Sequence, residues 1–496
     1  MATYSFPVTF SIFRVVLFFV FVILSIDKTA RALDFFDTNL KSRMDDNKHF
    51  VIEMPKTLQA MLQNDANRQS TFLRKQSVIK KHQRLQSIAK IRRELIEETK
   101  NNVSRKDRLN VAVDMHMHSG ADYGIGQYLV AFKAGTPSQK LKLIVDTGSD
   151  LTWMKCKYSC NNDPNKCSGI SGEDTKVDVF EADNSSSFNT IPCSSEMCKV
   201  DLSNLFSLAM CPFPITPCGF DYRYSDGSSA IGFFANETVT VGLTNGRKAK
   251  LHNILMGCSQ SSEGPSFRGR DVPDGVLGLG FSKSSFAVRA TDAFGGKFSY
   301  CLPNHLCPKN VSTHLTFSKP SYQNAATSNI FTTLGAIGTF YAVNIREISV
   351  GEELLNIPGE IWDVNGVGGA ILDTGSSLTF LALPAYKPIV AALTASLNKF
   401  QRLDIKLGQL DYCFNATGFS ELLDFPRLVF HFQDGTRFEP PVRNYVIDAA
   451  DGVKCLGLVP TVWPGVSVIG NIMQQNHVWE FDLVNGKLGF ASSSCT

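Results

Sequence analysis

Two aspartates stand in the same short motif, and carboxylates placed in this way could act as an acid–base pair. Asp146 opens Asp-Thr-Gly-Ser after the apolar residues Ile144-Val145, and Asp373 opens the same four residues after Ala370-Ile-Leu372. The two aspartates lie 227 positions apart. Two carboxylates held a few ångströms apart cannot both ionise easily, so they share a proton. Such a pair supplies one general base and one general acid, which together can activate a water molecule.

The repeated motif predicts two similar halves, each of which presents one aspartate at the end of an apolar strand. A lone Asp-Thr-Gly would be an ordinary turn, but the shared flanking residues make that alternative weak. The chain has 496 residues, 43% of them hydrophobic and 19% charged. That length exceeds one ordinary core and predicts two or three folded units.

The net charge of +3 hides an asymmetry along the chain. Residues 1–120 carry 20 Lys and Arg against 12 Asp and Glu, whereas the remainder carries 29 against 34. A basic head could bind nucleic acid, or it could be a pro-segment that covers an acidic cleft. The body has no nucleic-acid motif, which favours the pro-segment.

A short apolar core at residues 15–25 follows Arg14 and precedes Ala30-Arg31-Ala32. This pattern predicts a signal peptide over residues 1–32, cleaved near Ala32. A membrane anchor is the alternative, but the core is shorter than the ~20 residues that a span needs. The last residues also lack the hydrophobic tail of a GPI-anchor signal, so we expect no stable membrane anchor.

Residues 33–122 are the predicted pro-segment. They contain no cysteine, and residues 68–108 carry 13 Lys and Arg against 4 Asp and Glu. Apolar residues recur at a rough helical period over residues 70–99, which predicts a partly helical segment with a charged face. Residues 110–125 are interpreted as an exposed processing linker. His116 and His118 lie there without further ligands, so no metal site is expected.

After about residue 124 the sequence has a β pattern. Short β-branched runs are separated by Gly, Asn, Asp and Ser, which predicts an all-β protein with minor helices. The helices are expected around residues 195–198, 285–291 and 384–397. A Ser, Asn and Ala-rich stretch at residues 318–329 is the expected linker. It divides an N-terminal β lobe at 123–328 from a C-terminal β lobe at 329–496.

Thirteen cysteines, none of them before Cys156, fit the secretory route. The cluster Cys156-x3-Cys160-x6-Cys167 lacks the partners of a zinc site, so disulfides are favoured and one thiol is left over. Five glycosylation sequons agree with secretion. They begin at Asn102, Asn184, Asn236, Asn310 and Asn415.

Several independent elements, falling in order from Gln127 to Cys495, resemble the pepsin-like aspartic proteases. Beside the two aspartate motifs these are Ala-Gly-Thr-Pro137, Trp153, the flap-like Tyr224-Ser-Asp-Gly-Ser228, Gly275-Val-Leu-Gly-Leu-Gly280 and Val468-Ile-Gly-Asn471. The resemblance implies a bilobal all-β fold with a central cleft, preceded by the pro-segment. It implies Asp146 and Asp373 as the catalytic dyad.

The resemblance also assigns roles to the neighbours of the dyad. The glycines let backbone N–H groups approach the carboxylates, the threonines cross-link the two loops, and the serines bond the outer carboxylate oxygens. These residues are Thr147, Gly148, Ser149, Thr374, Gly375 and Ser376. Tyr224 is implied as the flap residue that closes over substrate and bonds the indole of Trp153.

Within that family the chain looks most like the plant nepenthesin-type branch. The cues are a Cys-rich insert after the first motif, Ile-Pro-Cys-Ser-Ser-Glu-Met-Cys198, Phe298-Ser-Tyr-Cys301 and Asp411-Tyr-Cys-Phe414. Similarity implies the disulfides Cys156–Cys160, Cys167–Cys258, Cys193–Cys218, Cys198–Cys211, Cys301–Cys495 and Cys413–Cys455, with Cys307 unpaired. The first Cys cluster is looser than is usual in the branch. The second motif is Asp-Thr-Gly-Ser where the branch often has Asp-Ser-Gly-Thr, and both versions supply hydroxyls.

The resemblance implies a secreted aspartic endopeptidase, made as a zymogen and active at acidic pH. It implies no cofactor, no nucleic acid, an extended protein or peptide substrate, the pro-segment as intramolecular inhibitor, and a monomer. The cell wall space is the expected location, with the vacuole or another secretory compartment as the alternative. The alternative function is a non-catalytic, inhibitor-like binding protein on the same fold. It is disfavoured because the catalytic set is complete.

Overall fold

The computed structural model describes eleven stretches of the chain: 111–159, 179–205, 207, 209–211, 216–224, 227–267, 272–305, 311–317, 330–405, 407–421 and 425–495. All of them belong to one unit, Met54–Thr496. The predicted signal peptide, the predicted helix at residues 70–99 and the linker at 318–329 lie outside the described residues. So do Asn102, Cys160, Cys167, Cys307 and Asn310.

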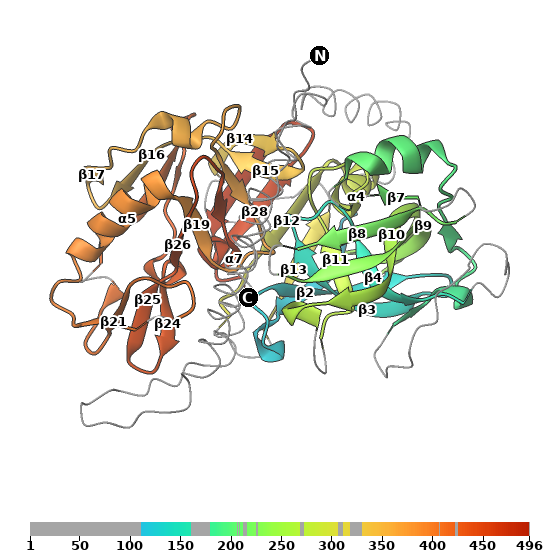
Figure 1. Ribbon diagram of the computed structural model, residues 1–496, viewed down its shortest axis with the longest axis horizontal. Coiled ribbons are helices and arrows are strands. Elements are labelled where there is room, and N and C mark those ends of the chain that lie inside the picture. The colour runs from blue at the N-terminus through green and yellow to red at the C-terminus, as the bar shows by residue number, and fades with distance from the viewer. Residues whose placement is uncertain are drawn as a thin grey trace, which may run out of the picture. The chain divides into compact units, whose positions relative to one another are not determined.

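Strands far outnumber helices among the described residues, as the sequence predicts (Figure 1). The N-terminal lobe contains β1 (Val113–Ser119), β2 (Tyr128–Ala134), β3 (Gln139–Asp146), β4 (Trp153–Lys157), β5 (Phe180–Glu181), β6 (Asn189–Thr190), β7 (Ala209–Met210), β8 (Gly219–Arg223), β9 (Ser229–Gly242), β10 (Lys248–Glu263), β11 (Gly275–Gly278), β12 (Lys297–Cys301) and β13 (Ser312–Phe317). Its described helices are α4 (Phe286–Phe294), five residues of π-helix at Met197–Asp201 and short 3-10 turns.

The C-terminal lobe is built in the same way. Its strands are β14 (Ile330–Ile337), β15 (Phe340–Val343), β16 (Ile345–Val350), β17 (Glu353–Leu354), β18 (Ala370–Leu372), β19 (Thr379–Ala382), β20 (Arg402–Leu403), β21 (Cys413–Asn415), β22 (Leu428–Phe432), β23 (Arg437–Phe438), β24 (Val446–Ala450), β25 (Val453–Leu456), β26 (Leu458–Thr461), β27 (Ser467–Ile469), β28 (His477–Asp482) and β29 (Lys487–Ser492). Its described α-helices are α5 (Leu383–Ala395) and α7 (Asn471–Gln474).

One sheet of 21 described strands includes strands from both lobes, and two four-stranded sheets complete the C-terminal lobe. The strands that lead into the two aspartates are central. β3 pairs in parallel with β11, and β18 pairs in parallel with β27. A strand inside a sheet that is covered on both faces reads as a continuous apolar run. This explains why both motifs follow such runs.

β1 lies within the stretch that the sequence analysis interpreted as an exposed linker of the pro-segment. It pairs with β13 at six positions and with β2 at three. Val113 and Met117 are fully buried, and Met115 is nearly so. The polar residues that alternate with them face outward, which gave the stretch its linker-like appearance. The folded lobe therefore includes residues before 122.

Five disulfides join described residues, and three of them correct the predicted pairing. Cys301–Cys495 and Cys413–Cys455 are present as expected. In place of Cys156–Cys160, Cys167–Cys258, Cys193–Cys218 and Cys198–Cys211, the structure has Cys156–Cys258, Cys193–Cys211 and Cys198–Cys218.

The corrections have a geometric reason in each region. β4 runs parallel to β10, which brings Cys156 beside Cys258 across the two strands, with their Cα atoms 5.1 Å apart. The other four cysteines form one cluster, in which Cys198 Sγ lies 3.2 Å from Cys211 Sγ although the two are not bonded. Sequence spacing cannot distinguish pairings among sulfur atoms gathered so closely.

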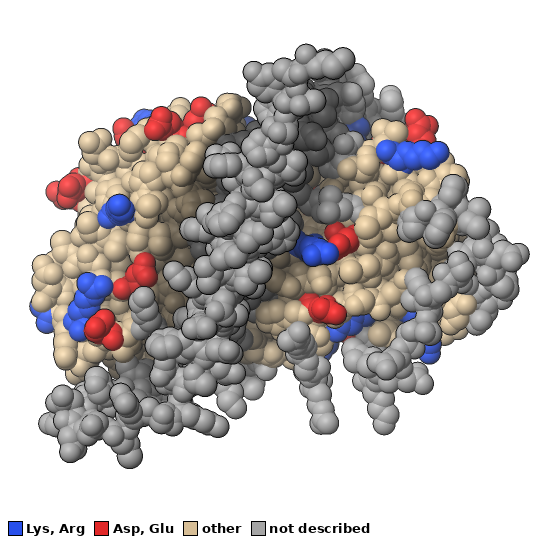
Figure 2. Space-filling model, in the orientation of Figure 1, with Lys and Arg blue, Asp and Glu red and all other residues tan. Residues whose placement is uncertain are grey.

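No helix among the described residues is both long enough and apolar enough to cross a bilayer. Lys, Arg, Asp and Glu are scattered over the described surface in the view of Figure 2, where no large patch of one sign is visible.

Candidate active site

The two aspartate loops have the same internal hydrogen bonds. In the first loop, the Gly148 N–H donates to Asp146 Oδ1 at 2.8 Å, and the Ser149 hydroxyl donates to Asp146 Oδ2 at 2.6 Å. In the second, the Gly375 N–H and the Ser376 hydroxyl make the same two bonds to Asp373, again at 2.8 and 2.6 Å. Both oxygens of each carboxylate therefore have a fixed donor, which sets the orientation of the carboxylate.

Two buried threonines tie the loops to each other. The backbone N–H of Thr147 donates to Thr374 Oγ1, and that of Thr374 donates to Thr147 Oγ1, both at 3.0 Å. Each hydroxyl then donates to a carbonyl on the strand of the other loop, Thr147 to Leu372 and Thr374 to Val145. Both side chains are fully buried, so this reciprocal lock fixes the spacing of the loops without water.

The glycines of the two motifs show that the carboxylates lie close together. A Cβ built on Gly148 would lie 2.7 Å from Asp373 Oδ1 and 3.2 Å from Asp146 Oδ1. A Cβ built on Gly375 would lie 2.6 Å from Asp146 Cγ. Each glycine thus lies against the carboxylate of the opposite lobe, and both carboxylates border one small space. Only glycine, which lacks a Cβ, fits at either position.

The predicted flap is the hairpin between β8 and β9. The Tyr224 N–H donates to the Ser228 carbonyl at 2.8 Å, which closes the hairpin. The Trp153 indole N–H donates to the Tyr224 hydroxyl, as the resemblance implied. Burial raises the pKa of Tyr224 well above its usual value, and the nearby charge of Asp146 raises it further. The hydroxyl therefore stays protonated, and it has a fixed orientation above the first loop.

Sequence reasoning missed several polar residues at the site. Tyr222 is fully buried beside Tyr224, with ring centroids 4.7 Å apart. The two-residue period of a strand could have placed both tyrosines on one face. Gln127 donates to the Gly375 carbonyl at 3.2 Å, and Asn471 donates to the Thr374 carbonyl at 3.0 Å. The resemblance had marked the segment that ends at Asn471, but neither of these two bonds was predicted, because each depends on how distant segments pack.

The described sequons differ in accessibility. Asn184 is exposed in a 3-10 turn. Asn236 is partly buried within β9, and Asn415 is partly buried at the end of β21, where its side chain accepts the Thr417 N–H at 3.0 Å. Of these three, Asn184 offers the most accessible amide for a glycan.

Comparison with known proteins places the chain in a family. Residues 128–317 match the family profile described as "Xylanase inhibitor N-terminal", and residues 340–492 match "Xylanase inhibitor C-terminal". Aspartic proteinase nepenthesin-1 of Nepenthes gracilis is 31% identical over 75% of this chain and 79% of its own length. Aspartyl protease family protein 2 of Arabidopsis thaliana is 33% identical over 76% of this chain and 73% of its own.

Among solved structures, basic 7S globulin from soybean superposes with a TM-score of 0.59 at 18% identity, over 78% of this chain and 96% of that chain. Conglutin gamma from lupine seeds gives 0.58 at 19% identity, over 77% and 95%. These two likenesses show the fold alone. Taken with the curated relatives, the matches show that the chain belongs to the pepsin-like aspartic protease family, in its plant nepenthesin-type branch.

Proposed function

We propose that the protein is an aspartic endopeptidase. The observation that carries this proposal is the pair of identical loops, locked together by Thr147 and Thr374, whose carboxylates border one space. A water molecule bound there would lie within reach of both Asp146 and Asp373. The relatives named as aspartic proteinases support the same reaction.

The proposed reaction is general acid–base hydrolysis of a peptide bond. The ionised aspartate takes a proton from the water as its oxygen attacks the carbonyl carbon, and the protonated aspartate donates to the carbonyl oxygen. A tetrahedral diol results. Its collapse breaks the C–N bond, transfers a proton to the amine nitrogen, and restores the singly protonated pair. The proton belongs to the pair, so neither aspartate is assigned it permanently.

The substrate would be an extended peptide between the lobes, covered by the flap hairpin that carries Tyr224. We further propose that the enzyme is made as a zymogen whose basic pro-segment is released at acidic pH, as carboxylates of the body lose their charge. Secretion to the cell wall space, glycosylation and a monomeric state without cofactor or metal complete the proposal. A vacuolar location is the alternative compartment.

A non-catalytic binding protein on the same fold is the second candidate. The observation that favours it is the description of both matching profiles as xylanase inhibitor domains. Both aspartates, both glycines, the four hydroxyls of the loops and Tyr224 are nevertheless present here. A protein that only binds another enzyme has no chemical need for this complete set.

Cleavage of peptides at pH 3–5, with and without pepstatin, separates the two candidates. We expect pepstatin-sensitive cleavage by the acid-processed protein. Asp146→Asn should lower kcat by about 10³-fold or more, because it removes acid–base catalysis. Asp363→Asn, at an exposed position of the C-terminal lobe, is the matched control and should leave kcat unchanged. Activity that survives Asp146→Asn, or no activity at any acidic pH after processing, would overturn the proposal.

A further inference from the structure

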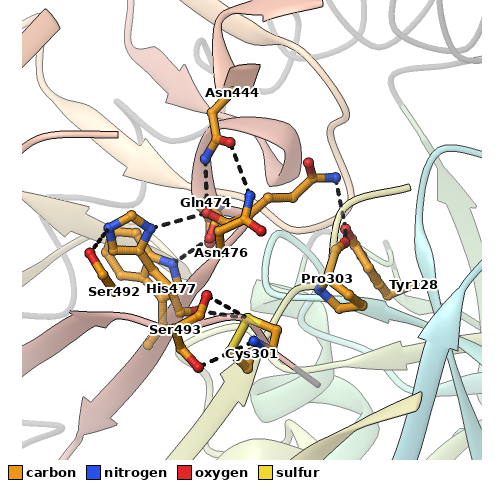
Figure 3. The surroundings of a disulfide bond; sticks show 12 residues. Tyr128, Cys301, Pro303, Asn444, Gln474, Asn476, His477, Ser492 and Ser493 are labelled. Carbon is orange, nitrogen blue, oxygen red and sulfur yellow. Dashed lines mark hydrogen bonds between the residues drawn. A yellow bond between two sulfur atoms is a disulfide. The ribbon is translucent and has the colours of Figure 1, made fainter. Parts of the chain in front are cut away.

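The segment that follows β12 brings a histidine to the contact between the lobes. Cys301 is joined to Cys495, and the Pro303 carbonyl accepts the Tyr128 hydroxyl (Figure 3). Tyr128 in turn accepts a 2.9 Å bond from the amide of Gln475. Two residues beyond Pro303, the ring of His305 stacks on the ring of Tyr128, with centroids 4.7 Å apart and planes 24° apart.

Both ring nitrogens of His305 have partners. Nδ1 lies 2.7 Å from the hydroxyl of Ser119, the last residue of β1. Nε2 lies 3.1 Å from Oδ1 of Asn471, the first residue of α7. The imidazole thus bridges the N-terminal strand of one lobe and a short helix of the other.

Asn471 continues the connection to the second aspartate loop. Its side-chain amide donates to the carbonyls of Thr374 at 3.0 Å and Gly126 at 2.7 Å. Its backbone N–H donates to the Ser376 carbonyl at 2.7 Å. Thr374 and Ser376 flank Gly375 in the loop of Asp373. A continuous chain of hydrogen bonds therefore runs from Ser119 through His305 and Asn471 into that loop.

The partners of His305 determine which nitrogen carries hydrogen. Asn471 uses its amide nitrogen as a donor to two carbonyls, so its Oδ1 must accept, and His305 Nε2 must donate. The Ser119 oxygen already accepts the Ala121 N–H at 3.1 Å, and its hydroxyl hydrogen is free to bond Nδ1. A neutral imidazole with hydrogen on Nε2 satisfies every group. A second proton, on Nδ1, would face the Ser119 oxygen and force that hydroxyl to turn away.

We propose that His305 is a positioning residue, whose Nε2–H holds Asn471 and, through it, the loop of Asp373, and that protonation of the ring, which places a charge among uncharged groups, weakens the contact between β1 and α7 that the ring bridges. Only the kinetic consequence of this inference depends on the proposed peptidase activity. It assigns to the site a regulation by acid that is separate from the titration of the aspartates.

The surroundings of the ring support this assignment. Its contacts among the described residues are all uncharged: Ser119, the Tyr128 ring, Asn471 and the Gly126 carbonyl. The side chain of His305 is partly buried. This burial lowers its pKa from 6.5 to about 4, and the bonds to Asn471 and Gly126 oppose the shift. The ring therefore changes charge inside the acidic range in which the proposed enzyme would work.

The direct test uses the full chain with Asp146→Asn, so that self-cleavage cannot interfere. Histidine side chains are labelled with 15N, and their resonances are followed from pH 7 to pH 3. The signal that disappears in His305→Gln identifies His305. We expect it to show hydrogen on Nε2 at pH 6 and to titrate near pH 4. Titration above pH 6, or hydrogen on Nδ1, would overturn the proposal whether or not the protein is a peptidase.

The kinetic test compares three variants of the active protein. His305→Ala should lower kcat at pH 5 by about 10- to 100-fold with little change in KM, because misplacement of a catalytic group costs rate rather than binding. His305→Gln, whose amide can donate to Asn471 without titrating, should recover most of that loss and should lose less activity than wild type between pH 5 and pH 3.5. His252→Gln, on the exposed part of β10, is the control. If His305→Gln and wild type lose activity in parallel as the pH falls, His305 does not regulate the site.

Discussion

The two aspartate loops have equivalent inner bonds but differ in what supports them from the other lobe. Gly278 and Gly470 occupy equivalent positions, since their N–H groups donate to Thr152 Oγ1 and Thr379 Oγ1. The residues that follow these glycines are Leu279 and Asn471. The Leu279 carbonyl accepts the hydroxyl of Tyr341 at 2.8 Å, whereas the Asn471 side chain is bonded to His305.

This difference separates a support that is insensitive to acid from one that responds to it. Tyr341 is fully buried, and burial raises its pKa well above the usual value, so it stays neutral at every pH at which the enzyme would work. His305 has a pKa of about 4. The fold is therefore symmetric where the chemistry needs two equal carboxylates and asymmetric where the loops are supported. We infer that acid loosens the loop of Asp373 before that of Asp146.

The first prediction tests the equality of the two loops. Gly148→Ala and Gly375→Ala each place a methyl group against the carboxylate of the opposite lobe. Both should lower kcat by about 10²-fold or more, because displacement of a reacting group by about 1 Å is enough to cost that much. Steady-state kinetics on one peptide substrate measures both. Gly359→Ala, where a Cβ meets no atom within 4 Å, is the control. Near-normal activity in only one of the two variants would show that the loops are not equivalent.

The second prediction concerns β1, which carries Ser119, the residue that contacts His305. Because its apolar residues are buried in the sheet, we expect the acid-processed chain to begin at or before Val113. N-terminal sequencing of the processed protein measures this. A mature chain that begins after Ser119 would contradict both the place of β1 in the fold and the contact between Ser119 and His305.

The third prediction concerns the threonine lock. Thr147→Val and Thr374→Val each leave a buried N–H and a buried carbonyl without a partner, which should lower the free energy of unfolding by about 2–5 kcal/mol. Chemical denaturation at pH 6 measures the loss. The two variants should be equally destabilised, because each removes an equivalent pair of bonds. The double variant should lose less than the sum, since both substitutions disrupt the same contact between the loops. Additive losses would show that the threonines act independently.

The smallest expected effect distinguishes the two residues that support the loops, Tyr341 and His305, by how the stability of the protein depends on pH. The folded state holds His305 near pKa 4, below the ordinary 6.5, so the unfolded state binds more protons between these values. The contribution of this group to the free energy of unfolding is fully present above pH 6.5. It is lost as the pH falls to 4, and the loss is at most about 3 kcal/mol. His305→Gln should remove this loss. Tyr341→Phe should cost about 1 kcal/mol at every pH.

Thermal unfolding of both variants in the Asp146→Asn background, from pH 3.5 to 7, measures the difference. If the Tm of His305→Gln and the Tm of Tyr341→Phe depend on pH in the same way, His305 and Tyr341 do not differ in their response to acid. His252→Gln again serves as the control, because its ring is exposed.

Much of the site could be predicted because it lies in the repeated motif itself. The bonds within each loop join residues two or three positions apart, so the motif contains both partners. The bond between Trp153 and Tyr224 was implied by family resemblance. The all-β fold followed from the alternation of short strands and turns, and the comparisons confirm the pepsin-like architecture.

The remainder depends on distant segments. Ser119, His305 and Asn471 come from three separate parts of the chain. Asn471 ends the Val468-Ile-Gly-Asn471 motif, but no local pattern marks Ser119, His305 or the bonds among the three. Four cysteines gather so closely that sequence spacing could not indicate their pairing: Cys193, Cys198, Cys211 and Cys218. β1 was missed because Asp114, His116 and His118 face outward, although the residues between them are buried. In each case tertiary packing supplies the information that local sequence lacks.

The central claim is that Asp146 and Asp373 act as one pair, and a double-mutant comparison tests it most directly. kcat/KM at pH 4 would be measured for wild type, Asp146→Asn, Asp373→Asn and the double variant. Groups that act as a unit are strongly non-additive, so we expect each single variant to fall by about 10³-fold or more and the double variant to fall little further. If either single variant keeps more than about a tenth of the wild-type activity, or if the losses multiply, the two aspartates do not form one catalytic dyad.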